Sequence, residues 1–258
     1  MAPPRAGDAL MQVACGGFRW GAVWVLSMRQ WRSGWRSRRF AGVAAFLAVT
    51  WPFRPPAVGL EALAAPFTLA AVAALLIGAA VIARDFDSGA MILDRLHGAT
   101  PLEMILGSIL FTTTAALAVA ATLSAGMLVA SPELLTPPGW IMILAGVLTL
   151  SAMCALLVLF GTVAPGYANS AIVVGLIIAV PGLAEIERLG LPQLLTQLFE
   201  LARAGLPLPH QLAATAAALT RGEAATVPMS VLAAGTVLAT VIAIGVVARR
   251  EPAGGWRR

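Results

Sequence analysis

Six apolar runs, the first of them short, dominate the sequence and set which folds are open to it. A bilayer core of about 30 Å is crossed by about 20 apolar residues in a helix, and every backbone polar group inside it must be bonded within the segment. With 59% hydrophobic and 11% charged residues, the chain holds more apolar surface than a soluble core buries. We therefore predict an all-α integral membrane protein. Six transmembrane helices are expected at about residues 40–53, 60–83, 104–130, 140–164, 168–186 and 229–248.

The arginines predict how these helices are oriented. All 17 basic residues are Arg, and short cytoplasmic loops carry the excess positive charge of membrane proteins. With the N-terminus inside, only Arg54, Arg188, Arg203 and Arg221 fall on the outer side. We expect a multi-pass protein of the cytoplasmic (inner) membrane with both termini cytoplasmic. Its parts are then a cytoplasmic segment at 1–39, a six-helix domain at 40–248 with a cytoplasmic loop at 84–103 and an external segment at 187–228, and a tail at 249–258.

Aromatic and basic residues alternate through the N-terminal segment with the period of a helix. At about 100° per residue, four tryptophans share an arc of roughly 60°, and three arginines share another arc about 120° away. Trp prefers the headgroup level and Arg reaches lipid phosphates, so this pattern predicts an interfacial helix on the cytoplasmic face. A soluble amphipathic helix packed on a protein partner is the alternative. The residues concerned are Trp20, Trp24, Trp31 and Trp35, and Arg29, Arg32 and Arg36.

The segment at 187–228 has helical runs, few charges and a break at Leu206-Pro207-Leu208-Pro209. It is too apolar for a freely solvated loop. We expect short re-entrant or interfacial helices before the last span. An ordinary extracellular loop is the other interpretation.

Several chemistries are excluded by residues that the chain lacks. Without Lys it cannot form the Gly-Lys-Ser/Thr loop that cradles nucleotide phosphates. The apolar runs carry no ionisable residue well inside, which argues against an ion-coupled carrier. His97 and His210 fall on opposite sides, and no metal or catalytic cluster emerges. We expect no catalysis, metal or cofactor in this chain, so a pump of this kind needs energy from another polypeptide. Lipoprotein processing at Cys15 is possible, although Asp8 interrupts the apolar stretch before it.

The loop at 84–103 has the order of features found in one transporter family. From Ile82 it reads IARDFDSGAMILDRLHGATPLEMILG. It resembles the permeases of type-2 ABC exporters, whose loop commonly runs I-x-R-E-x-E-x-G-T, followed by a short helix and a turn before the next span. Asp85, Asp87 and Gly89 match the two acids and the glycine.

The turn before the next span extends this resemblance, with Thr100, Pro101 and Glu103. The layout agrees as well: a basic interfacial helix, six spans, a broken segment before the sixth span and a basic C-terminus. The sequence departs from the common residues of the family pattern at Ala90, Gly98, Pro101 and Ser108.

The resemblance implies a short coupling helix that docks on a separate cytoplasmic ATPase. It would present apolar Ile92, Leu93 and Leu96 on one side, and polar Asp94, Arg95 and His97 on the other. MgATP would then bind to the ATPase subunit. A second permease chain, identical or related, would complete the pathway. The other expected partner is the lipid bilayer, and no nucleic acid is expected.

Few charges in the spans favour a lipophilic or amphipathic substrate. Two alternatives stay open: a permease resembling the haem exporter of cytochrome c maturation, and a non-transporting membrane scaffold or uncoupled secondary carrier. A neighbouring gene for an ATPase with a phosphate-binding loop would distinguish the exporter from the scaffold.

Overall fold

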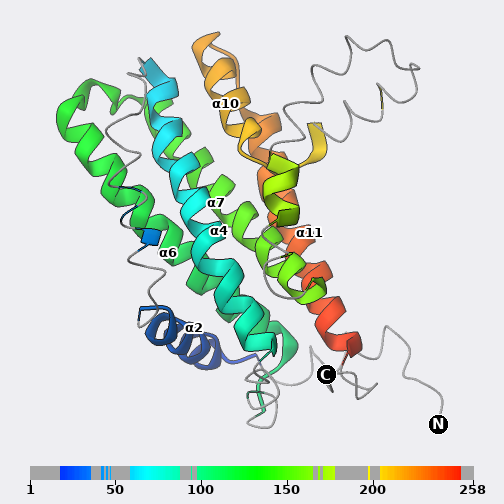
Figure 1. Ribbon diagram of the computed structural model, residues 1–258. Coiled ribbons are helices and arrows are strands. Elements are labelled where there is room, and N and C mark those ends of the chain that lie inside the picture. The colour runs from blue at the N-terminus through cyan, green and yellow to red at the C-terminus, as the bar shows by residue number, and fades with distance from the viewer. Residues whose placement is uncertain are drawn as a thin grey trace.

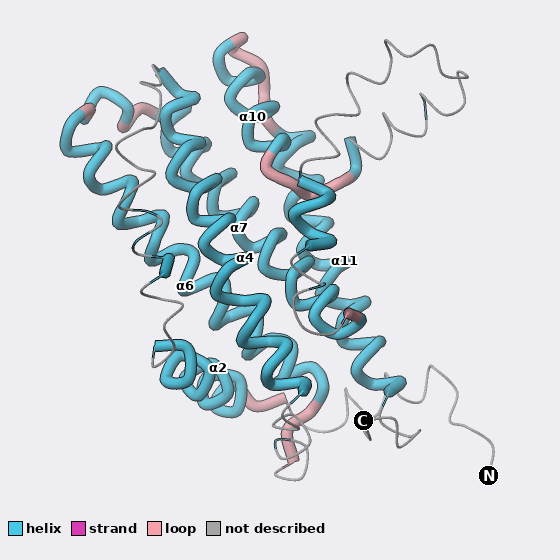
Figure 2. The backbone as a smooth tube through the Cα atoms, viewed as in Figure 1, coloured by secondary structure: helices cyan, strands magenta, loops and turns pink. Residues whose placement is uncertain are grey.

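The computed structural model describes residues 18–35, 59–87, 98–164, 171–177 and 204–250, together with single residues at 42, 43, 45, 47, 94, 168 and 197. All regular structure in this part of the chain is helical, as predicted. Figure 2 shows helices and short loops in the described part of the chain. The elements are α2 (Trp20–Trp35), η1 (Gly59–Leu63), α4 (Ala64–Asp87), α6 (Pro101–Ala130), η2 (Pro132–Leu134), α7 (Pro137–Val163), α10 (His210–Thr220) and α11 (Thr226–Arg250).

Four of the described helical segments are long and apolar enough to cross a membrane: Gly59–Leu76, Pro101–Val129, Pro137–Val163 and Thr226–Arg249. They coincide with four of the predicted runs, those beginning near residues 60, 104, 140 and 229. The predicted spans at 40–53 and 168–186 fall largely outside the described residues. The described part of the chain is therefore all-α, and its four long apolar helices suggest a multi-pass membrane protein.

The starts of α6 and α7 are set by local sequence. At α6, the Thr100 hydroxyl accepts a hydrogen bond from the Glu103 amide (3.2 Å), and the Glu103 carboxylate accepts one from the Thr100 amide (2.8 Å). This reciprocal capping box satisfies two amides that have no partner inside the helix. At α7, Thr136 caps the amide of Gly139, and Pro137 takes the first helical position.

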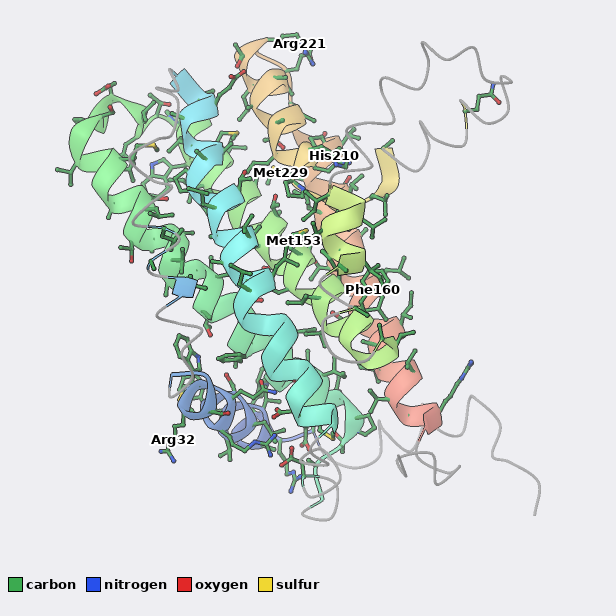
Figure 3. All side chains as sticks on the ribbon, viewed as in Figure 1. Arg32, Met153, Phe160, His210, Arg221 and Met229 are labelled. Carbon is green, nitrogen blue, oxygen red and sulfur yellow. The ribbon has the colours of Figure 1, made fainter. Side chains whose placement is uncertain are left out.

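The long helices α4, α6, α7 and α11 run side by side, with α2 across one end and α10 at the other (Figure 1). Of the four candidate spans, α7 is the most buried and α11 the least. Helix α7 contacts α4, α6 and α11. Met153, labelled in Figure 3, lies in the middle of this bundle and is buried.

Two glycines allow the helices to approach closely in the bundle. A Cβ at Gly146 of α7 would overlap the ring of Phe67 in α4, and a Cβ at Gly78 of α4 would meet Leu157 and Thr112. Small residues at crossings are the usual means of close helix packing in membranes. Gly126 in α6 has open space around its Cα instead, so small size has no packing role there among the described residues.

The segment before the last span contains a helix, as the sequence predicts. Helix α10 packs against α7, α11 and η1 through buried Leu212 and Ala216. The Gln211 amide donates to the carbonyl oxygens of Ala204 (2.9 Å) and Leu206 (3.3 Å). These bonds satisfy backbone groups that the following prolines leave outside a helix.

Candidate functional site

The candidate site is a network of polar side chains that joins α2 to the connection between α4 and α6. We call this set the α2 network. It draws three residues from α2 and the turn before it, and the others from the end of α4, the connection itself and the start of α6. Its members are Arg19, Arg29 and Gln30, and Asp85, Asp94, Glu103 and Ser108.

Glu103 is the most connected carboxylate of the network. It accepts hydrogen bonds from the Arg19 backbone amide (2.9 Å), from Arg19 Nε (3.1 Å) and Nη2 (3.2 Å), and from the Thr100 amide (2.8 Å). Its side chain is 0% exposed, whereas that of Arg19 is 54% exposed. A buried carboxylate is tolerated only when its oxygens are bonded in this way. One residue therefore both caps α6 and fixes the beginning of α2.

Arg19 also contacts the backbone of the connection itself. Its Nη2 donates to the carbonyl oxygen of Gly98 at 2.6 Å, and Gly98 has a positive φ of 81°, a conformation that glycine adopts without strain. The hydrogen bond and negative charge of Glu103 raise the pKa of Arg19 further above its usual value. Arg19 is therefore a permanent cation at this turn.

Arg29 joins two carboxylates from different parts of the chain. Its Nη1 binds Asp94 in the connection, and its Nη2 binds Asp85 near the end of α4 at 3.3 Å. The Asp85 and Asp94 side chains are 10% and 14% exposed. Gln30 adds a neutral link, since its Nε2 donates to Asp85 (2.8 Å) and to the Ser108 hydroxyl of α6 (3.0 Å).

Apolar packing holds α2 against α6 beside these polar bonds. A Cβ at Gly107 of α6 would lie 2.9 Å from Leu26 Cβ and 3.3 Å from the Val23 carbonyl oxygen, so glycine allows the two backbones to touch. Further along, Trp31 Nε1 donates to Thr114 (3.2 Å), and the Trp31 ring meets Phe111 edge-on with centroids 5.6 Å apart. Such aromatic pairs add about 1 kcal/mol beyond burial.

The tryptophans that the sequence places on one face of α2 differ in their exposure in the structure. Trp20 and Trp24 are 70% and 57% exposed, whereas Trp31 is partly covered by α6. Arg32 is exposed and projects away from the bundle (Figure 3). Arg29, three residues earlier, instead bonds to Asp85 and Asp94. The side chain of Trp35 and all of Arg36 lie outside the described residues.

Five of the residues expected at the coupling site can be placed. Asp85 and Asp94 meet at Arg29, while Thr100 and Glu103 form the capping box with Pro101 at its first helical position. Asp85 and Glu103 are buried and hydrogen-bonded within the chain. They therefore hold the connection in place and do not present their side chains to a partner. Asp87 is the last residue of α4, and its side chain is not among the described ones. The other expected residues lie outside the described ranges: Gly89, Ile92, Leu93, Arg95, Leu96 and His97.

Sequence reasoning missed Arg19, Gln30 and Ser108 as members of the network. Arg19 precedes α2, and Gln30 carries no charge that would single it out. Ser108 stood out only as a departure from the family pattern. Helical periodicity gives one weak indication. It places Gln30 on a face of α2 that carries neither the tryptophans nor Arg29, and a polar residue on that face could have been considered as a contact to another helix.

Metal chemistry finds no support within the described residues, where no group of three or more His, Cys, Asp or Glu could hold an ion. Cys154 is a free thiol buried in α7. No protein-family model, no curated protein and no solved structure matches this chain.

Proposed function

We propose that this chain is the permease subunit of an ATP-driven exporter of the type-2 ABC kind. It moves a lipophilic or amphipathic substrate across the cytoplasmic membrane, and a separate ATPase subunit supplies the energy. A second permease chain completes the pathway. The chain crosses the membrane six times with both termini in the cytoplasm, as the distribution of arginines favours.

One observation carries this proposal: the connection between α4 and α6 is bonded at one end to α2 and at the other end to Arg19, the residue just before α2. Asp85, near the end of α4, binds Arg29, and Glu103, in the first turn of α6, binds Arg19. A connection fixed in this way moves with the two apolar helices that it joins. An ATPase bound to it can therefore tilt those helices, whereas a loosely attached loop would absorb the movement.

The faces of α2 support a position at the membrane surface. On one flank, Trp31 bonds to Thr114, well inside the apolar helix α6. On the opposite flank, Arg29 bonds to Asp94 in the polar connection. Exposed Trp20 and Trp24 share the Trp31 flank. This division of apolar and polar flanks is the pattern of a helix that lies in the headgroup region.

Co-purification with an ATPase tests the coupling. The purified chain should retain an ATPase subunit that contains a phosphate-binding loop and should raise its rate of ATP hydrolysis. Proline substitutions at Leu93 and Leu96 should abolish both effects, because they break a docking helix. ATPase association that survives replacement of residues 90–101 would contradict the proposal, and a chain that binds no ATPase would favour the scaffold.

Cysteine labelling tests the topology. In a background with Cys15→Ser and Cys154→Ala, a cysteine at Ser88 should react with a membrane-impermeant reagent only after the membrane is opened. A cysteine at the exposed Ala224, next to the start of α11, serves as the matched control and should react in intact cells. Labelling of Ser88 from outside would overturn the orientation and the coupling proposal together.

A further inference from the structure

Helix α2 has a protein-facing side on which its contacts are concentrated. Val23, Leu26, Ser27 and Gln30 are buried there, and Gly107 lets this side touch the backbone of α6. The polar bonds extend from Arg19, just before the helix, and from Arg29, in its second half. A rigid helix packed in this way is well suited to hold other parts in register.

The connection between α4 and α6 is bonded to α2 at three separate places. The first is Asp85 near the end of α4, the second is Asp94 within the connection, and the third is the turn from Gly98 to Glu103. The backbone of the connection is itself bonded between these places, since the Ala99 amide donates to the Asp94 carbonyl (3.0 Å). A shift of α2 must therefore move all three places together.

Arg29 links two of these places, because it binds both Asp85 and Asp94. Its planar guanidinium presents two nitrogens to two carboxylates at once, a geometry that the single ammonium of lysine does not reproduce. Without it, Asp85 and Asp94 would be two largely buried carboxylates without their shared cation. Among the hydrogen bonds of the described residues, the one from Gln30 would then be the remaining link between α2 and Asp85.

We propose that α2 is the positioning element of the α4–α6 connection and that Arg29, by bridging Asp85 and Asp94, sets the position in which the connection meets its partner. Arg29 is a positioning residue, since it acts through the two aspartates. The inference rests on the proposed function only for the identity of that partner. The position itself belongs to this chain and can be measured without an ATPase.

Hydrogen exchange of the purified full-length chain tests the position directly. Arg29→Ala should speed exchange of the Ala99 and Met104 amides about tenfold, because a charge-assisted pair that holds their segment is lost. Arg32→Ala is the matched control. It removes an exposed arginine from the same helix and should leave these amides unchanged. Equal exchange in the two variants would overturn the proposal.

Steady-state kinetics with the bound ATPase test what the position does. Arg29→Ala should lower the stimulated kcat about tenfold and leave the KM for ATP unchanged, because the nucleotide site lies in the other subunit. Arg29→Lys should recover only part of the loss, since lysine holds one aspartate at a time. Full recovery with lysine would show that charge alone matters and would overturn the role of the bridge.

A triple variant separates positioning from stability. Arg29→Met with Asp85→Asn and Asp94→Asn removes the unpaired carboxylates, so the melting temperature should return toward that of the unaltered chain. Stimulation of the ATPase should stay low, and its recovery would overturn the proposal. If the unaltered chain stimulates no ATPase, the proposed function fails, while the exchange result still decides whether α2 positions the connection.

Discussion

The two ends of the helical bundle are held by different kinds of interaction. At the α2 end, charged and amide side chains bond across three segments, with Glu103 fully buried and Arg29 shared by two carboxylates. At the α10 end, close packing predominates, beside the hydrogen bonds that Gln211 donates to the Ala204 and Leu206 carbonyls. A Cβ at Gly235 of α11 would overlap the ring of Pro207, and one at Gly139 would overlap the carbonyl of Leu134. An ion pair at that end, Arg221–Glu223, is solvent-exposed.

This difference bears on the proposed docking of an ATPase. Close apolar packing has one low-energy arrangement and resists small shifts. A polar network keeps a second arrangement within reach, because its donors and acceptors can exchange partners with water or with a bound protein. Under the proposed function, the α2 end would meet the ATPase, and the α10 end would hold the helices together. Four substitutions test this contrast, in decreasing order of expected effect.

Added bulk should damage the α10 end most. Gly139→Ala should destabilise the chain by about 3 kcal/mol, because the new methyl meets a backbone carbonyl that cannot rotate away. Thermal unfolding in detergent micelles measures the change. Gly126→Ala, which enters open space in a helix, is the control and should stabilise by about 0.5 kcal/mol. Equal tolerance of both alanines would show that the α10 end is not closely packed.

Loss of a charge should damage the α2 end. Glu103→Ala removes the acceptor of the capping box and of Arg19, and it should cost about 2 kcal/mol in the same assay. This figure allows for solvent screening, because Arg19 is half-exposed. Glu133→Ala, at an exposed position of η2, should change nothing. A loss below about 0.5 kcal/mol for Glu103→Ala would remove the contrast between the ends.

The tryptophans of α2 allow a finer test. Trp31→Phe keeps an aromatic ring against Phe111 but loses the hydrogen bond to Thr114, so it should cost about 1 kcal/mol. Trp24→Phe in detergent should cost nothing measurable, because the side chain is exposed. If the two variants behave alike, Trp31 does not hold α2 against α6.

The exposed ion pair should show the smallest effect. The hydrogen bond from Arg221 lowers the pKa of Glu223 below its ordinary value of 4.5. Any stability that the ion pair adds is therefore complete above pH 4.5, and it is lost as the pH falls through the lower pKa of Glu223 in the folded state. Because both side chains are exposed, melting curves of Glu223→Gln and the unaltered chain should coincide at pH 7. A clear difference there would mean that the α10 end also depends on charge.

Particular residues show how far sequence reasoning reaches. The turn at Thr100, Pro101 and Glu103 is visible in sequence, because a capping box has a fixed spacing. The four described spans follow from apolar length alone. Trp31 shows the limit. Helical periodicity places it with Trp20 and Trp24, but contact with Phe111 and Thr114 depends on where α6 passes.

Helical structure and suitability for a membrane could be read from the amino-acid sequence, since apolar length and local capping are properties of consecutive residues. The sequence also predicted a helix within the segment before the last span. The meeting of Arg19, Arg29 and Gln30 with Asp85, Asp94, Glu103 and Ser108 depends on how the helices pack in three dimensions. Those pairings join residues far apart along the chain. They arise from the way α2 crosses α6 at Gly107, and no local pattern records such a crossing.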